Sequence, residues 1–175
     1  MNKSIAPLDL SWLLFETPAG TTHVGAMLLF KKPRGRPGVV REIVEAYRQF
    51  RPTSPFNFVP EMLGRGAPHF REVEDWDPYY HVGHLSLPAG SSYQDLLRLV
   101  ADLHEPMLDR DRLLFRCWII DGIPGGRFAI SDMVRTEQGA MSMPAVGNEP
   151  LAMEAPMLLA GCTALASDSR SASVI

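Results

Sequence analysis

Three features of the sequence predict an α/β fold. Apolar residues recur at spacings of three and four in residues 39–50 and 92–103, which is the pattern of amphipathic helices. Between and after these segments lie apolar runs bounded by proline and glycine, which are typical of strands. The last two runs, residues 113–121 and 127–130, are joined by the glycine-rich turn Gly122–Gly126. They predict a hairpin whose first strand is buried on both faces.

The N-terminal segment is expected to form a helix and then a strand. The helix is predicted at Leu8–Glu16, where apolar residues are dense. Asp9 or Ser11 is the candidate N-cap, because a short polar side chain can accept a hydrogen bond from the first helical turn. The strand is predicted at His23–Phe30, and the loop Lys31–Gly38 closes it.

The middle of the chain is expected to alternate between helix, irregular structure and strand. Residues 51–78 are rich in proline and aromatic residues and are therefore predicted to be largely irregular. The expected elements are, in order, a helix at Val39–Phe50, a short strand near His69–Val73, a strand at Tyr79–Leu87, and a helix that runs from a cap at Ser91 or Ser92 to Leu103.

The character of the chain changes near residue 130, and this change predicts two parts, residues 1–130 and residues 131–175. The second part contains no aromatic residue but holds five of the nine methionines. Such a segment buries little area per residue, so it offsets the entropy of ordering poorly, and we expect a poorly ordered tail. Leu151–Leu165 is apolar enough for a weak helix, which Pro156 and Gly161 interrupt.

Composition argues against several classes of protein. The formal net charge is −3 and the basic residues are scattered, so nucleic acid is not an expected partner. The densest basic cluster, Lys31, Lys32, Arg34 and Arg36, indicates a solvated loop first and a surface for anionic lipid or phosphate second. The N-terminus is too polar for a secretory signal, and no stretch reaches the ~18 apolar residues of a spanning helix. We therefore expect a cytoplasmic protein that meets a membrane, if at all, from the side.

The candidate nucleophiles lack the context that catalysis requires. Cys117 and Cys162 show no CxxC spacing, which argues against a disulfide framework or a zinc site, and Cys117 is expected to be inert packing in a buried strand. Ser142 has no Gly-x-Ser-x-Gly context. His23 is expected to be hydrogen-bonded at a strand edge rather than to face a substrate channel.

The remaining histidine arrangements also favour structural roles. His81 and His84 are three residues apart, which on a strand would place them on opposite faces, so no metal is expected between them. His104, followed by Asp109 and Asp111, is predicted at the C-terminal end of a helix. An imidazole there interacts favourably with the helix dipole.

Three stretches resemble the bacterial wax ester synthase/diacylglycerol acyltransferase family. Pro7–Phe30 is similar to the family's start, in which a Pro-Leu helix leads into a strand that carries His-Val-Gly. Glu74–Gly90 resembles the family's Asp…Tyr-His-Val strand and its Leu-Pro-x-x-Gly turn. Leu103–Ile130 resembles the segment with a Leu-Asp-Arg turn and an Ile-Asp-Gly hairpin, although Leu113-Leu114-Phe115 stands in place of the family's Pro-Leu-Trp motif.

The resemblance implies a fold and a reaction. The implied fold is that of CoA-dependent acyltransferases such as chloramphenicol acetyltransferase, a mixed sheet with flanking helices, here incomplete because residues 1–130 match only the N-terminal part. The implied reaction moves a long-chain acyl group from acyl-CoA to diacylglycerol or a fatty alcohol, giving triacylglycerol or wax ester. Acyl-CoA and an acceptor lipid are the implied partners, with contact to a membrane or lipid body. No cofactor is implied beyond acyl-CoA as co-substrate.

One departure from the family bears directly on activity. The family continues after the strand that holds Ile130 into His-His-x-x-x-Asp-Gly, whose second histidine is implied to be the general base. Here Ser131–Ala140 follows, and no histidine occurs after His104. No catalytic residue is therefore assigned, the substrate-binding residues are unknown, and the chain is expected to be a truncated, inactive relative. The alternatives are a non-catalytic lipid-binding or interaction module and the product of a disrupted reading frame.

Overall fold

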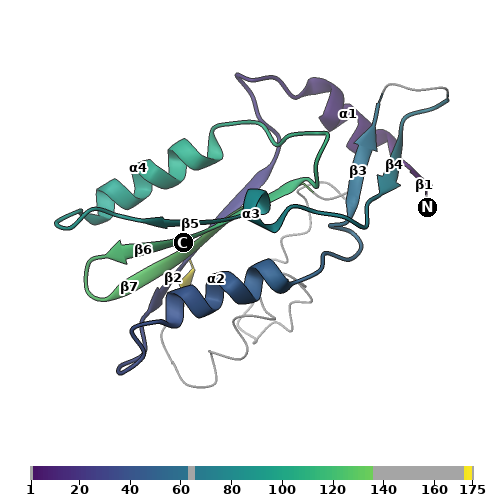
Figure 1. Ribbon diagram of the computed structural model, residues 1–175. Coiled ribbons are helices and arrows are strands. Elements are labelled where there is room, and N and C mark those ends of the chain that lie inside the picture. The colour runs from purple at the N-terminus through teal and green to yellow at the C-terminus, as the bar shows by residue number, and fades with distance from the viewer. Residues whose placement is uncertain (1, 63–65, 136–171, 175) are drawn as a thin grey trace, which may run out of the picture.

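The computed structural model describes residues 2–62, 66–135 and 172–174, which form two sheets and four helices (Figure 1). A five-stranded sheet has the order β5-β6-β7-β2-β8, and a three-stranded sheet has the order β1-β4-β3. The elements are β1 (Asn2–Ser4), α1 (Pro7–Phe15), β2 (Val24–Lys31), α2 (Val39–Gln49), β3 (Phe58–Glu61), β4 (His69–Glu72), α3 (Pro78–His81), β5 (Val82–Ser86), α4 (Tyr93–His104), β6 (Phe115–Ile123), β7 (Arg127–Val134) and β8 (Ala172–Val174).

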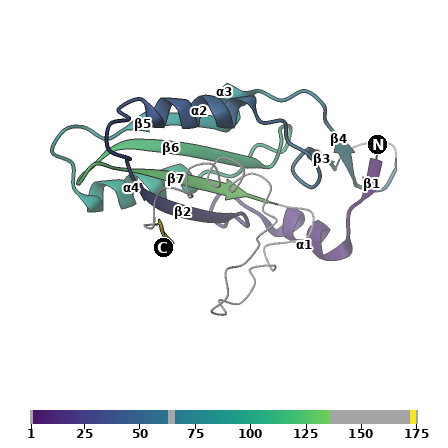
Figure 2. The same ribbon diagram turned by 90° about the horizontal axis from the view of Figure 1, so that it is seen from below.

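Strand β6 lies inside the larger sheet and is buried on both faces. It pairs in parallel with β5 and antiparallel with β7. On one face Trp118 and Ile120 pack with α4, and on the other face Cys117 and Ile119 pack with α2. Figures 1 and 2 show these two helices on opposite sides of the sheet. The prediction of a strand buried on both faces, within a mixed sheet flanked by helices, is confirmed.

Both amphipathic helices form where the sequence predicts them. In α2 the buried side chains recur every three or four residues, namely Val39, Val40, Ile43, Val44 and Tyr47. Helix α4 begins with a capping box in which the Ser92 hydroxyl accepts a hydrogen bond from the Asp95 N–H, and the Asp95 carboxylate accepts one from the Ser92 N–H. Ser92 is therefore the cap, and Ser91 is not.

The predicted cap of α1 is wrong. Its N-cap is Ala6, which supplies no side-chain hydrogen bond, and Pro7 occupies the first turn. Proline suits this position because the first-turn N–H that it lacks has no partner within the helix. Asp9 lies inside the first turn and is buried, and the Ser11 hydroxyl donates to the Leu8 carbonyl oxygen.

The predicted strand Tyr79–Leu87 is wrong over its first residues. A single helical turn, α3, precedes β5, because the Asp77 carboxylate caps it by accepting hydrogen bonds from the N–H groups of Tyr79 and Tyr80. Proline at position 78 again suits the start of a helix. The aromatic residues that favour a strand are thus overridden by a strong local helix-start signal.

The segment expected to be irregular forms most of the smaller sheet. Strand β4 was predicted, but β3 and β1 were not. Strand β3 contains Pro60, which disfavours a strand in sequence patterns, and the polar residues of β1 are all exposed. Both strands exist because they pair with β4, with Val59 opposite Arg71 and Lys3 opposite Phe70.

The hairpin between β6 and β7 depends on glycine. Gly122 has a φ of +77°, and a Cβ atom there would lie 2.5 Å from the Leu87 carbonyl oxygen. Strand β7 continues past Ile130 to Val134, because Asp132 stays in register with neighbouring strands on both sides. Most of residues 131–175, including the weak helix predicted at Leu151–Leu165, lies outside the described residues. Among those that are described, no helix is long and apolar enough to cross a membrane.

Candidate functional site

The residue that follows β7 is Arg135, at the point where the resemblance implies that the catalytic histidines begin. Its N–H donates to the Leu114 carbonyl oxygen at 2.8 Å, which fixes the backbone against the start of β6. Its guanidinium Nη2 lies 2.5 Å from Glu16 Oε1, and its side chain is only 7% exposed. Arg135 is always protonated near neutral pH, so it cannot act as a base.

Glu16 joins three parts of the chain. It directly follows α1, and its side chain is 2% exposed. Arg110 Nη2 donates to Glu16 Oε2 at 3.1 Å, and the Thr22 N–H donates to Oε1 at 3.0 Å. Burial raises the pKa of Glu16, but the hydrogen bonds from Thr22, Arg135 and Arg110 outweigh burial and hold the pKa below its ordinary value. The carboxylate is therefore ionised at neutral pH and connects α1 with the loop before β6 and the end of β7.

His104 ends α4, as predicted, and its partner is a buried serine. His104 Nε2 and Ser131 Oγ are 2.9 Å apart, and the Ser131 hydroxyl donates to the Ala26 carbonyl oxygen at 3.4 Å. His104 therefore donates its Nε2–H to Ser131. Ser131 is 0% exposed, so this pair cannot present a nucleophile to a substrate. Instead it connects the C-terminal end of α4 to β7. Burial lowers the pKa of His104, and the nearby His23 lowers it further.

Two glycines make room for the rings beside this contact. A Cβ atom at Gly25 would lie 2.3 Å from His104 Nδ1, and a Cβ atom at Gly83 would lie 2.7 Å from Trp118 Cδ1. The rings of His104 and Trp118 are 6.0 Å apart. The glycines of the His-Val-Gly segments on β2 and β5 thus permit close approach of an aromatic ring to the sheet.

His23 lies beside His104, with ring centroids 6.4 Å apart. The expected hydrogen bond at a strand edge is not formed by its Nδ1, which is buried without a partner among the described residues. The position of His23 just before β2 places it at the end of the sheet where α4 also ends.

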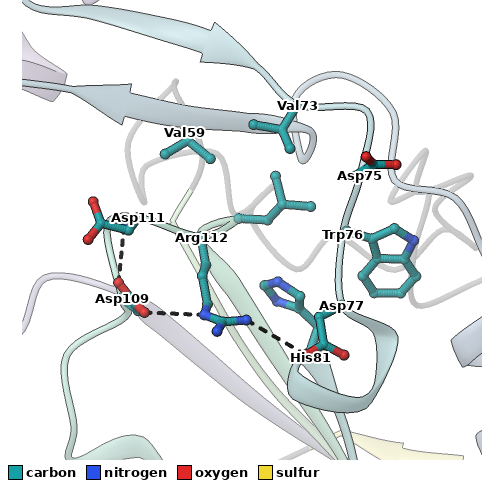
Figure 3. Close-up of a pocket in the computed structure, with 10 residues that line it drawn as sticks. Val59, Val73, Asp75, Trp76, Asp77, His81, Asp109, Asp111 and Arg112 are labelled. Atoms are coloured by element: carbon teal, nitrogen blue, oxygen red, sulfur yellow. Dashed lines mark hydrogen bonds and ion pairs between the residues drawn. The ribbon is translucent and has the colours of Figure 1, made fainter.

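Sequence reasoning grouped His104 with Asp109 and Asp111, and the structure separates them. The two aspartates line a cavity of about 460 Å³ (Figure 3). The cavity lies between the smaller sheet, α3 and the loop before β6, and its lining residues are Val59, Val73, Asp75, Trp76, Asp77, His81, Asp109, Asp111, Arg112 and Leu113.

His81 is the buried imidazole of this cavity. It is the last residue of α3 and 1% exposed, whereas His84 is an exposed residue of β5. The predicted alternation of both histidines along one strand is therefore wrong, because His81 belongs to α3. His81 Nδ1 donates to the Phe115 carbonyl oxygen at 2.8 Å, so Nε2 is the ring nitrogen with a free lone pair. Burial lowers the pKa of His81, and the charges of Arg116 and Arg112 lower it further, so the ring is neutral near pH 7.

The other candidates have structural positions or lie outside the described residues. Cys117 is 3% exposed and belongs to the core beneath α2, as predicted. In the basic loop, Lys32 pairs with Asp121 and Arg36 with Glu42. Ser142 and Cys162 lie outside the described residues, and the residues that are described contain no group of three ligands that could hold a metal ion.

Asp132 is a functional candidate that sequence reasoning missed. Its Oδ1 is buried without a hydrogen-bond partner in the described part of the chain. Burial raises the pKa of Asp132 to about 7. The signal in the sequence was a lone acidic residue inside an apolar strand, just past the boundary that the change in composition predicts. Glu16 and Arg110 were harder to recognise in the sequence as buried ion-pair partners, because charged residues beside apolar runs usually lie in solvent.

Replacing Arg135 tests the buried ion cluster. We expect Arg135→Met to lower the free energy of unfolding by about 3 kcal/mol, because it removes one of two cations from a carboxylate buried away from water. The matched control is Arg36→Met, which removes an exposed ion pair and should cost less than about 1 kcal/mol. Urea denaturation followed by circular dichroism measures both. Equal losses would contradict a structural role for the cluster.

Replacing Asp132 tests the buried carboxyl. Its pKa is about 7 in the folded state and near 3.8 in the unfolded state, so its contribution to stability is lost as the pH rises through this interval. An asparagine side chain at this position cannot ionise. The unfolding free energy of Asp132→Asn minus that of the parent should therefore grow between about pH 4 and pH 7 and level off above it. Urea denaturation at a series of pH values measures this difference, and a constant difference would refute the prediction.

Comparisons with known proteins agree over this same region. The family model of the wax ester synthase/diacylglycerol acyltransferase catalytic domain matches residues 5–134. A putative diacylglycerol O-acyltransferase of Mycobacterium bovis is 39% identical over 127 residues, which are 72% of this chain and 27% of the relative. A probable diacylglycerol O-acyltransferase of Mycobacterium tuberculosis is 35% identical over 130 residues, 71% and 28% of the two chains. This chain therefore spans roughly a quarter of the length of these relatives.

Solved structures share the fold. The wax ester synthase/diacylglycerol acyltransferase from Marinobacter aquaeolei VT8 superposes with a TM-score of 0.70 at 29% identity, covering 76% of this chain and 34% of that one. The first condensation domain of the CDA synthetase superposes with a TM-score of 0.55 at 15% identity, covering 77% and 33%. The second likeness concerns the fold alone, and with the first it confirms the predicted fold class, an α/β fold with a mixed sheet and flanking helices. With the match over residues 5–134, the chain belongs to the wax ester synthase/diacylglycerol acyltransferase family.

Proposed function

We propose that the function encoded with this chain is acyl transfer from a long-chain acyl-CoA to the hydroxyl group of a diacylglycerol or a fatty alcohol. The thioester bond breaks, an ester bond forms, and the proton of the alcohol passes to the CoA thiolate. Family membership and the names of the mycobacterial relatives support this reaction class. Because the chain spans 27% and 28% of two such relatives, the activity is proposed for the whole protein to which these residues correspond.

We further propose that residues 1–175 alone do not catalyse this reaction. The observation that carries the proposal is Arg135, a buried guanidinium paired with Glu16 at the end of β7, where the resemblance implies a pair of histidines. General-base catalysis contributes about 10²–10⁴-fold to such rates. No histidine follows His104 in the sequence.

His104 and His81 do not replace the missing base. His104 directs its Nε2–H to Ser131, which is inaccessible to substrate. His81 has a free lone pair, but four aspartates line its cavity, and their charge repels the phosphate groups of CoA. In this part of the family's fold the described residues therefore position the sheet and do not move a proton.

An acyltransfer assay tests this proposal. The purified chain is incubated with radiolabelled palmitoyl-CoA and either dioleoylglycerol or hexadecanol, and ester and free CoA are measured. We expect neither product above the protein-free rate. The Marinobacter aquaeolei enzyme serves as the positive control for the substrates. Ester formation by this chain at about one turnover per second, an ordinary enzymatic rate, would refute the proposal.

The alternative of a lipid-binding module without catalysis is favoured by one surface. Helix α1 leaves four large apolar side chains exposed, namely Leu8, Trp12, Leu14 and Phe15, and Phe15 is 75% exposed. An apolar patch of this kind on a short helix can insert into the interface of a lipid layer.

Vesicle flotation tests the alternative. The chain should float with phosphatidylcholine vesicles that contain diacylglycerol, and the double variant Leu14→Ser/Phe15→Ser should not, because the apolar area that inserts is removed. The control is Tyr79→Ser, which removes another large exposed side chain, 70% exposed, from α3 instead of α1. Loss of flotation in the control, or no flotation of the parent chain, would contradict the alternative.

A further inference from the structure

We propose that the cavity around His81 binds a small primary alkylammonium ion, with the ammonium group between His81 and the aspartates and the alkyl chain along the apolar wall. This site is separate from the end of β7 and does not depend on the acyltransfer function. Its volume of about 460 Å³ falls in the usual range for small-ligand pockets.

The apolar wall is built by β3 of the smaller sheet, by the segment between β4 and α3, and by the loop before β6. Val59 of β3 and Leu113, just before β6, are 4% and 3% exposed, and Val73 and Trp76 are partly buried beside them. Figure 3 shows the two valines on the opposite side of the cavity from Arg112 and Asp77. This wall can accommodate an alkyl chain, and the face of an indole ring attracts organic cations.

The hydrogen-bond acceptor beside the apolar wall is His81 Nε2. Because Nδ1 is committed to the Phe115 carbonyl oxygen, the tautomer is fixed, and Nε2 can only accept a hydrogen bond. No described residue donates to it. The tilted contacts of the ring with Phe115 at 4.6 Å and with Trp76 at 5.7 Å hold the imidazole in place. His81 is 1% exposed and lines the cavity, so an acceptor on its ring that no described residue pairs fits a ligand that donates hydrogen bonds.

The charges of the cavity select a cation. Four aspartates and one arginine line it. Arg112 lies 3.4 Å from Asp109 and 3.7 Å from Asp77, and its guanidinium stacks on the Tyr80 ring at 4.2 Å, so its charge is already compensated. Asp75 and Asp111 form no ion pair with any residue that the structure describes.

These three features together specify the ligand. The excess of carboxylates disfavours an anion, and the lone pair of His81 requires a donor. The apolar wall favours a carbon chain over a metal ion or a fully polar amine. A primary ammonium group meets the first two demands with three N–H donors, and an alkyl chain of about five carbons fits a cavity of this size.

Calorimetric titration of the full 175-residue chain with n-pentylamine at pH 7 tests the proposal. We expect saturable binding of one amine per chain that weakens as sodium chloride is added, because charge attraction contributes. n-Pentanol, which donates a hydrogen bond without a charge, should bind more weakly, and pentanoate should not bind. Absence of saturable binding, or equal binding of pentanoate, would overturn the proposal.

Variants locate the site. Asp75→Asn and Asp111→Asn alter exposed side chains and should each weaken amine binding by about two- to fivefold. The matched control is Asp102→Asn, an exposed aspartate of α4 outside the cavity, which should leave binding unchanged. His81→Asn retains a donor for the Phe115 carbonyl oxygen, removes the Nε2 acceptor, and should weaken binding most. Circular dichroism melting verifies that each variant is folded. Equal affinity of all four variants and the parent would place the amine elsewhere and overturn the proposal.

Discussion

Burial of β6 on both faces is the constraint on which the other elements depend. Because its side chains alternate between two cores, Trp118 and Ile120 require a cover on one side and Cys117 and Ile119 a cover on the other. Helices α4 and α2 supply these covers, and β5 and β7 satisfy the hydrogen bonds of its backbone. A fully buried large apolar side chain stabilises a fold by about 1.5–3 kcal/mol, so this strand concentrates much of the stabilisation in one place.

Polar groups then fix what apolar packing leaves free. Apolar contacts are not directional, so a helix on a sheet can slide at little cost unless a directed contact holds it. The hydrogen bond from His104 to Ser131 holds the C-terminal end of α4 on β7, and the capping box at Ser92 fixes where the helix begins. Glu16 performs the same task for α1, since its carboxylate is held by arginines from two other segments. The residues most similar to a catalytic pair, His104 and Ser131, thus have a structural role.

The sequence was most informative where one segment decides its own structure. The spacing of Val40, Ile43 and Val44 predicted α2, and the apolar run from Phe115 predicted β6, because each pattern matches one period of secondary structure. Prediction from the sequence failed where pairing with another segment decides the structure. Strand β3, for example, exists because it pairs with β4. The error at α3 has another cause, because two local signals compete there and the Asp77 carboxylate outweighs the strand preference of two tyrosines. For the site, the sequence located the histidines but not their partners, since the contact of His104 with Ser131 joins residues 27 positions apart.

The glycine beneath the His104 ring restricts where α4 can lie on the sheet. Gly25 is flanked on the same face of β2 by Met27, a core residue, so a shift of α4 by two strand positions would press the His104 ring onto a methionine side chain. Gly83 of β5 lies directly beside Trp118 of β6, so it makes room for the indole ring within the sheet and does not restrict α4. The contact at Gly25 therefore admits one placement of the His104 ring on β2 and excludes the neighbouring one by steric overlap. Substitutions in the apolar core can therefore alter the packing of the core while α4 keeps its position on the sheet.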